Sequence, residues 1–237
     1  LRLYPESFGN VPVILPPADH QQKIANFLDH ETAKIDILIE KQQQLIKLLK
    51  EKRQAVISHA VTKGLNPNAP MRDSGVEWLG EVPEHWSVTR LKYECNRIVD
   101  CPHSTPEYSE EGIYPAIRTA DISVGYMDIP NSRRVTKGVY KYRNLRLTPK
   151  SGDIIYSREG ERFGIGALIP EGEKVCLAQR VMLFRIEETP EYLMWALNSQ
   201  STYKQAQQDV IGSTSPHVNV DTIKNFVLAW PPKAERK

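Results

Sequence analysis

Residues 19–63 contain neither proline nor glycine, and this absence constrains the fold of the chain more than any other feature. Gly64 and then Pro67 follow the run and supply a helix stop. Acidic residues dominate the first half of the run and basic residues the second half, an order that suits the helix dipole. The sequence therefore predicts one α-helix over residues 18–63, which at 1.5 Å per residue spans about 65 Å.

The predicted helix carries a stripe of aliphatic side chains at alternating steps of four and three residues, the pattern of a coiled coil. Glu31, Gln42 and Lys52 interrupt the stripe, and polar residues at such positions can specify register. In an antiparallel pair centred near Gln42, Glu31 would lie close to Lys52. The alternative is a long surface helix resting on its own domain. We expect pairing with another helix through Ile24, Leu28, Ile35, Leu38, Gln42, Leu45, Leu49 and Val56.

The composition is typical of a soluble globular protein, with 40% hydrophobic and 25% charged residues in a chain of 237. No stretch approaches the roughly 18 apolar residues of a membrane-spanning helix, and the N-terminus lacks a signal-peptide pattern. The three cysteines form an odd, scattered set, which indicates a reducing compartment without a disulfide framework. We therefore expect a cytoplasmic protein with no membrane partner.

The C-terminal part of the chain has the pattern of a mixed α/β domain. The runs GDIIYSRE (152–159) and VCLAQRVMLFRI (175–186) are rich in β-branched and aliphatic residues, and glycines separate short predicted strands. Thr189-Pro190-Glu191 predicts the capped start of a helix that continues to about Gln208. Asp221 is predicted to cap a last short turn before the strand NFVLAW.

Trp78 and Trp86 flank a Gly-Glu-Val-Pro turn at the beginning of this region. Two tryptophans around a turn usually bury their large side chains at the edge of a domain, although they could also stack on bases. We favour the structural role.

Positive charge is concentrated in one segment of the nearly neutral chain. Residues 113–162 carry ten lysines and arginines against five acids, whereas residues 63–112 carry five against nine. Such a segment can be a solvated face, but clustered arginines also neutralise phosphates and can bind guanine. Some of these arginines are expected to pair with neighbouring acids instead. The candidate DNA contacts, including hydroxyls and a histidine of the 212–219 loop, are Arg118, Thr119, Arg133, Arg134, Lys137, Lys141, Arg143, Arg158, Arg162, Ser213, Thr214 and His217.

The sequence contains no recognisable catalytic motif. There is no G-x-x-x-x-G-K-[ST] phosphate loop, and no G-x-G-x-x-G opens a helix. Asp153, Glu159 and Glu161 are grouped, yet no lysine follows at the spacing of a metal-dependent nuclease. The histidines and cysteines lack metal-ligand spacing. We expect no catalytic residue, metal or cofactor in this chain, and keep two alternatives to DNA recognition: a cryptic metal-dependent nuclease and a helical scaffold that binds only protein.

Several stretches together resemble the specificity subunits of type I restriction-modification enzymes. The first is SGVEWLGEVPEHW, and it is followed in order by YPAIRTADI, SREGERFGIGALI, AQRVMLFRI and GSTSPHVNVDTIKNFVLAWPP. An aliphatic run leading into a Pro-Pro pair occurs twice, at Pro16-Pro17 and Pro231-Pro232. The resemblance covers essentially the whole chain. Each motif is degenerate, but their joint order is specific.

The resemblance implies a domain organisation, because such subunits carry two target recognition domains, each followed by a long helix. We expect a fragment or half-subunit with one complete recognition domain of mixed α/β fold. Its expected parts are the tail of a preceding domain (1–17), the coiled-coil helix (18–63), a linker and the beginning of the domain (64–89), the target recognition domain (90–232) and the start of a second helix (233–237).

The resemblance also implies a function. The chain would recognise one half of a bipartite target in double-stranded DNA and would hold modification and restriction subunits together. S-adenosylmethionine, Mg²⁺ and ATP would belong to those partner subunits. The chain could also form a homodimer through its long helix.

Overall fold

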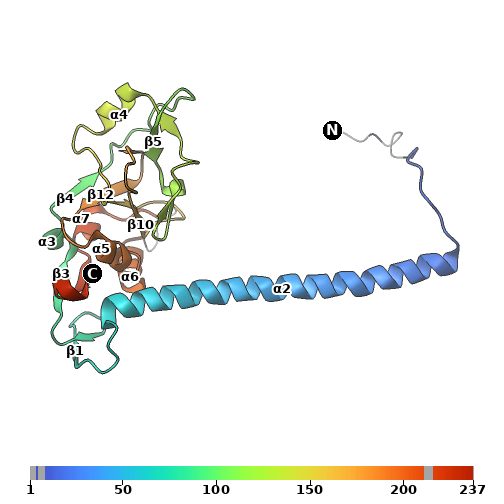
Figure 1. The fold of residues 1–237 in the computed structure, drawn as a ribbon, viewed down its shortest axis with the longest axis horizontal. Coiled ribbons are helices and arrows are strands. Elements are labelled where there is room, and N and C mark those ends of the chain that lie inside the picture. The colour runs from blue at the N-terminus through green and yellow to red at the C-terminus, as the bar shows by residue number, and fades with distance from the viewer. Residues whose placement is uncertain (1–3, 5–8, 211–215, 237) are drawn as a thin grey trace. The chain divides into compact units, whose positions relative to one another are not determined.

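The computed structural model of this chain describes residue 4, residues 9–210 and residues 216–236. It contains two units, Leu1–Lys52 and Arg53–Lys237. Helix α2 (Ala18–Lys63) extends through the first unit, and its last residues, 53–63, belong to the second (Figure 1). The predicted 18–63 helix is confirmed, and so is the predicted combination of a mixed α/β domain with one long helix.

The aliphatic stripe of α2 is exposed to solvent. Each of its aliphatic members has between 48% and 62% of its surface accessible. Ion pairs within the helix, such as the one between Lys34 Nζ and Glu31 Oε1 at 2.7 Å, lie among these side chains and contribute only a few tenths of a kcal/mol each, roughly. The stripe is therefore an apolar surface that the described residues leave open.

The core of the second unit is a four-stranded antiparallel sheet with the order β10-β9-β12-β4. Its strands are β4 (Arg97–Asp100), β9 (Ile154–Ser157), β10 (Ile165–Leu168) and β12 (Val181–Arg185). Ile154 and Tyr156 belong to the apolar cluster on one face, whereas Ile155 belongs to the cluster on the other. A sheet buried on both faces needs apolar residues at every position, so β9 and β12 are continuous apolar runs without alternation.

Helices cover one face of this sheet. They are α5 (Pro190–Leu197), α6 (Gln200–Val210) and α7 (Val220–Lys224), which pack together with the strand pair β3 (Ser87–Arg90) and β13 (Val227–Trp230). Leu193 from α5 and Phe226, just before β13, are almost completely buried there.

Smaller elements cover the opposite face. They are the sheet β11-β5-β8, the hairpin β6-β7, the 3₁₀ turn η1 and helix α4, which lies beside β5 (Figure 1). Their bounds are β5 (Tyr114–Ile117), η1 (Thr119–Asp121), β6 (Ile122–Ser123), β7 (Tyr126–Met127), β8 (Arg134–Val135), α4 (Lys137–Arg143) and β11 (Cys176–Leu177).

The two tryptophans anchor an edge of the domain, as predicted. Trp86 is 3% exposed and packs with Leu79, Val82 and Ala229, and Trp78 lies against the same cluster. The elements of this region are β1 (Met71–Asp73), β2 (Glu81–Pro83), α3 (Leu91–Glu94) and the 3₁₀ turn η2 (Lys233–Glu235).

Two local predictions are corrected by the structure. The helix expected from Thr189 to Gln208 is two helices, because the Asn198 side chain bonds both the N–H and the C=O of Gly166 at the break, at 3.0 and 2.8 Å. The cap of α7 is Asn219, whose side chain accepts a hydrogen bond from the N–H of Asp221 at 3.1 Å. Asp221 is therefore in the first turn rather than at the cap.

Polar contacts hold the last turns of α2 against α5 and α6 within the second unit. Gln54 Nε2 donates to the Asn198 carbonyl at 2.8 Å, and Ser58 Oγ accepts from the N–H of Gln200 at 2.9 Å. The hydroxyl of Tyr192, on α5, lies 3.1 Å from the Val61 carbonyl and 2.8 Å from the Ala229 carbonyl. Burial raises the pKa of Tyr192, so this hydroxyl remains a donor.

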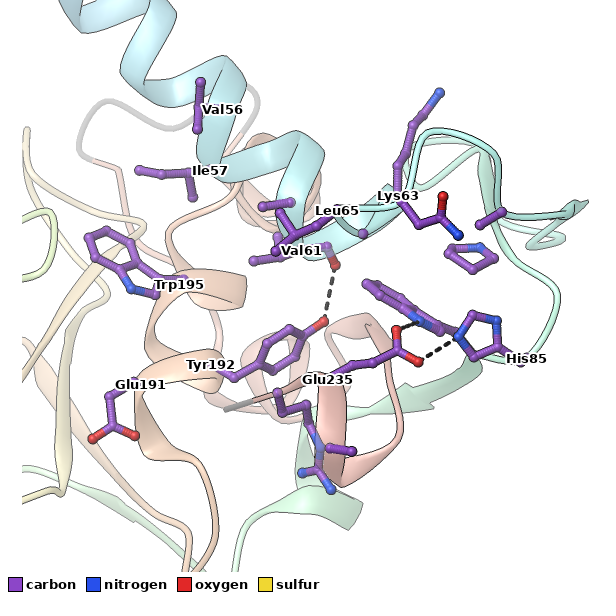
Figure 2. Close-up of a pocket in the computed structure, with 18 residues that line it drawn as sticks. Val56, Ile57, Val61, Lys63, Leu65, His85, Glu191, Tyr192, Trp195 and Glu235 are labelled. Atoms are coloured by element: carbon purple, nitrogen blue, oxygen red, sulfur yellow. Dashed lines mark hydrogen bonds and ion pairs between the residues drawn. The ribbon is translucent and has the colours of Figure 1, made fainter.

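Beside this junction lies an apolar groove of about 840 Å³ (Figure 2). Val56 and Ile57 from α2 line one side, and Tyr192 and Trp195 from α5 line another. Glu235 lies at its edge, where it accepts hydrogen bonds from Trp86 Nε1 at 2.9 Å and pairs with His85 Nε2 at 2.7 Å. These hydrogen bonds lower the pKa of Glu235.

We predict that Tyr192→Phe lowers the free energy of unfolding by about 1 kcal/mol, because a buried hydroxyl that bonds two carbonyls is removed. The matched control is Tyr156→Phe in the same apolar cluster, because the buried Tyr156 hydroxyl has no hydrogen-bond partner among the described residues. Tyr156→Phe should leave stability unchanged or raise it. Urea denaturation measures both changes, and equal effects of the two substitutions would contradict the assigned role of the Tyr192 hydroxyl.

Candidate functional site

Exposed and half-buried basic side chains without acidic partners gather on β8, α4 and the residue before β8. We call this set, Arg133, Arg134, Lys137 and Lys141, the α4 surface. The Arg133 guanidinium lies 5.0 Å from the centre of the Tyr108 ring, and Arg134 Nη1 donates to the Ile113 carbonyl at 3.0 Å. Among the described residues, none of the four forms an ion pair. Their charge is available to a ligand outside the chain.

Two members of the α4 surface, Arg133 and Arg134, line a hollow of about 320 Å³ together with Tyr108, Ser109 and Glu110. Tyr108 supplies an aromatic face and the arginines supply donors, a combination found in nucleic-acid interfaces. Behind it, Tyr114 and Tyr140 stack with ring centres 4.2 Å apart and hold α4 against β5.

Arg118 and Arg162 have partners within the chain and lie around the turn η1. Arg118 donates from Nε and Nη2 to the carboxylate of Asp121 at 2.9 and 2.5 Å, and this hydrogen bonding raises the pKa of Arg118. Arg162 Nη1 donates to the Ala120 carbonyl at 2.8 Å. Thr119 begins η1 and is half-buried. Asp121 neutralises the charge of Arg118, whereas Arg162 is exposed and forms no ion pair among the described residues, so its DNA contact stays a prediction.

The structure corrects the prediction for Arg143. Its side chain is buried, although it comes from the same helix as Lys137 and Lys141. The guanidinium donates to the carbonyls of Leu177, Ala178, Pro102 and Ser104 at 2.5, 3.0, 3.2 and 2.9 Å. Burial lowers the pKa of Arg143. All its donors are used inside the domain, so it cannot reach DNA.

Arg158 and His217, 59 residues apart in the sequence, are brought together by the structure. A β-bridge joins Glu159 to His217, and the N–H of Val218 donates to the Arg158 carbonyl at 3.0 Å. The Arg158 side chain is 3% exposed and pairs with Glu159 Oε1 at 3.0 Å. Its Nε also lies 3.2 Å from Asp100 Oδ1, without hydrogen-bond alignment. Arg158 is therefore an internal residue rather than a DNA contact.

Both ring nitrogens of His217 also have partners. Nδ1 lies 3.0 Å from Glu159 Oε1, and Nε2 lies 3.3 Å from Arg158 Nη1. A guanidinium has only donors, so Nε2 accepts, and Nδ1 carries the ring hydrogen beside Glu159 without hydrogen-bond alignment. These contacts hold residues 216–218 against the end of β9, while the His217 side chain stays 54% exposed, so its role as a donor to DNA stays a prediction. Ser213 and Thr214 lie outside the described residues.

Arg180 was missed by the sequence analysis. It immediately precedes β12, its side chain is 59% exposed, and its Nε lies 3.5 Å from Glu159 Oε2. No local pattern marks it, because it reaches Glu159 only through the pairing of β12 with β9.

The acidic group that suggested a nuclease is separated by the fold. Asp153 precedes β9 and pairs with Arg185 at 2.7 and 2.8 Å, whereas Glu159 follows β9. Six residues of extended chain span on the order of 20 Å, so the two carboxylates cannot share a metal ion. Within the described ranges, no group of three metal-ligating side chains occurs. The described helices also include none that is both long and apolar enough to cross a bilayer.

Comparison with known proteins gives one consistent family. Residues 84–237 match the family model described as the type I restriction modification DNA specificity domain. The chain is 25% identical to the type I restriction enzyme MjaVIII specificity subunit of Methanocaldococcus jannaschii, over 97% of this chain and 54% of the relative. It is also 25% identical to the EcoKI specificity subunit of Escherichia coli K12, over 98% of this chain and 50% of the relative. The chain thus spans about half the length of the curated relatives it matches.

Solved structures share the fold. One, described as the structural basis of complex assembly and conformational transition of the type I R-M system, has a TM-score of 0.64 at 16% identity, over 94% of this chain and 50% of that chain. The crystal structure of the HsdS subunit from Thermoanaerobacter tengcongensis has a TM-score of 0.50 at 14% identity, over 94% and 49%.

We predict that Arg143→Met lowers the free energy of unfolding by about 2–4 kcal/mol, because the buried Leu177 and Ala178 carbonyls and the partly buried Pro102 and Ser104 contacts lose their donor. Lys141→Met is the matched control on the same helix, since its side chain is exposed and forms no ion pair among the described residues. It should change stability by less than about 0.5 kcal/mol. Chemical denaturation tests both, and a mild effect of Arg143→Met would show that the carbonyls find other donors.

Proposed function

The chain belongs to the family of type I restriction-modification DNA specificity domains, and from this premise we propose that it recognises one half of a bipartite target in double-stranded DNA. The single observation that carries the location of the DNA interface is the α4 surface. Lys and Arg that form no ion pair within a domain can neutralise DNA phosphates and release counterions. The charges of Arg143, Arg158 and Arg185 are used inside the domain, so they do not contribute.

We further propose that α2 is a spacer and scaffold that pairs with a second copy of itself. Acids predominate in residues 19–40 and bases in residues 41–53. An antiparallel pair places each acidic half beside a basic half, whereas a parallel pair places like charges together. Antiparallel pairing also covers the exposed aliphatic stripe. The pairing residues remain those proposed from the sequence, from Ile24 to Val56.

Chemistry is assigned to other subunits in this proposal. Methyl transfer and cleavage belong to modification and restriction subunits that the chain would hold on DNA. S-adenosylmethionine, Mg²⁺ and ATP would be bound there. The recognition domain supplies shape and charge but no reacting group.

We predict that Arg133→Ala combined with Arg134→Ala weakens DNA binding of the chain assembled with its modification subunit. The slope of log affinity against log salt should become shallower by about 2, because two phosphate contacts are lost. Lys92→Ala with Lys204→Ala removes two exposed charges on α3 and α6 and should leave the slope unchanged. Fluorescence anisotropy over a salt series measures the slopes.

An equal loss in both double variants would mean that only net charge matters and that the interface is misplaced. If the assembly without substitutions binds no DNA at low salt, the result would instead favour the alternative of a helical scaffold that binds only protein.

We predict that Glu31→Cys combined with Lys52→Cys forms a disulfide-linked dimer, because antiparallel pairing about Gln42 brings position 31 of one copy beside position 52 of the other. Glu31→Cys alone should not cross-link. Cys101 and Cys176 are buried, and Cys95 is half-buried with a thiol whose pKa burial raises to about 12, so the chain without the introduced cysteines should remain monomeric on a non-reducing gel. Efficient cross-linking by the single variant would demonstrate a parallel pair and overturn the proposed orientation.

A further inference from the structure

We propose that Arg180 is a DNA contact and that Glu159 positions it, an inference that rests on the proposed DNA-binding function. The group it would bind is an acceptor on duplex DNA, either a phosphate oxygen or the O6 and N7 edge of a guanine. The residues that build this site are Asp100, Arg158, Glu159, Arg180 and His217, which we call the Glu159 cluster. Three positions remote from one another in the sequence, Asp100, Arg180 and His217, supply it together with the first two residues after β9.

The backbone of Arg180 is the first support. Its φ is +67°, in the left-handed region that costs a residue with a Cβ on the order of 1 kcal/mol. Among the described residues, only Thr189 shares this conformation without being glycine. The Arg180 carbonyl accepts a hydrogen bond from the N–H of Arg158 at 3.1 Å, which ties the strained residue to the end of β9. A glycine would satisfy this backbone without strain, so an arginine here needs another explanation.

The side chain of Arg180 is the second support. Its Nε pairs with Glu159 Oε2, and more than half of the side chain is exposed. No described residue forms a hydrogen bond or ion pair with its two terminal nitrogens. The edge of the guanidinium that binds phosphate or guanine through two parallel hydrogen bonds is therefore free.

The third support is the fixed position of the Glu159 carboxylate. Its Oε1 lies 3.0 Å from both Arg158 Nη2 and His217 Nδ1. These two contacts hold the carboxylate independently of Arg180, which lies beside Oε2. Arg158 is itself buried beside Asp100. Orienting Arg180 in this way lowers the entropy that the side chain would lose on binding. Glu159 is thus a positioning residue, and it acts on DNA only through Arg180.

The charges of the cluster support this division of roles. Two carboxylates and two guanidinium groups face one another around a neutral His217, with the His103 ring 3.2 Å from Asp100 Oδ2. Glu159 placed near DNA would repel phosphates if it had no other function. Simple electrostatics and the positioning role therefore predict opposite changes in DNA affinity when the charge of Glu159 is removed.

The test uses the full chain assembled with its modification subunit and a pool of short duplexes with a randomised centre. Competitive selection from this pool gives both affinity and base preference. Glu159→Gln keeps the shape of the side chain but removes its charge. The positioning role predicts binding weakened several-fold, whereas loss of a repulsive charge alone predicts tighter binding. Tighter or unchanged binding would overturn the role of Glu159.

Arg180→Gly separates function from folding. It relieves the backbone strain, so the melting temperature should stay near that of the unmodified chain while affinity falls about tenfold, the loss expected for one good arginine contact. Thr189→Gly is the matched control, because it also replaces a left-handed residue but lies outside the cluster. It should leave DNA binding unchanged. Unchanged binding by Arg180→Gly would overturn the proposal.

Arg180→Lys distinguishes the two acceptors. It also keeps the positive charge and a side chain at this position, so it tests the contact even if the glycine variant does not fold. A phosphate contact predicts nearly unchanged base preference and salt slope, with a modest loss of affinity. A guanine contact predicts a relaxed base preference at one position of the target, because lysine cannot form the bidentate hydrogen bonds of a guanidinium. Full DNA affinity and full base preference in both Arg180→Lys and Glu159→Gln would contradict the proposal.

The same measurements separate this inference from the proposed function. If Arg133→Ala with Arg134→Ala weakens DNA binding while the Arg180 variants do not, only this inference fails. If the assembly without substitutions binds no duplex, the proposed function fails as well.

Discussion

The pairing of β9 with β12 is the constraint on which the rest of the recognition domain depends. Both strands are buried on both faces, so neither can shift register without moving apolar side chains between the two clusters. The register places Ser157 opposite Val181. The residues just beyond this pair, Arg158 and Glu159 on one strand and Arg180 on the other, must therefore meet at the same end of the sheet. At the opposite end of β9, Asp153 meets Arg185 by the same reasoning.

Burial decides which arginines remain available to DNA. A guanidinium inside a domain must find acceptors, because an unpaired buried charge costs several kcal/mol, roughly. Arg143 satisfies this need with four carbonyls, and Arg158 satisfies it with two carboxylates. The net positive charge of residues 113–162 is thus divided by the fold. Some of these charged residues hold loops and strands together. Those on the α4 surface form no ion pair among the described residues, so their charge can act on a ligand outside the chain.

The long helix serves a different physical purpose from the domain. Its last turns contribute the Val61 side chain to the core and the Val61 carbonyl to the Tyr192 hydroxyl, so the helix end is part of the second unit. Its remaining aliphatic stripe faces solvent over a length that no single small domain could cover. Such a surface, with opposite charge in its two halves, favours association with another helix of the same kind. In the proposed function, recognition and spacing are divided between these two parts of one chain.

The sequence by itself determined the elements that depend on long runs of local periodicity. The absence of proline and glycine over residues 19–63 determined α2, and continuous apolar runs determined β9 and β12. The bend at Asn198 and the cap at Asn219 escaped prediction, because side-chain contacts with Gly166 and with the local backbone override helix propensity. Only the tertiary structure decided which basic residues are free. Lys141 and Arg143 are two residues apart on one helix, yet one faces solvent and the other faces four carbonyls from distant segments. His217 meets Arg158 across 59 residues because strand pairing, rather than sequence proximity, determines which charges become neighbours.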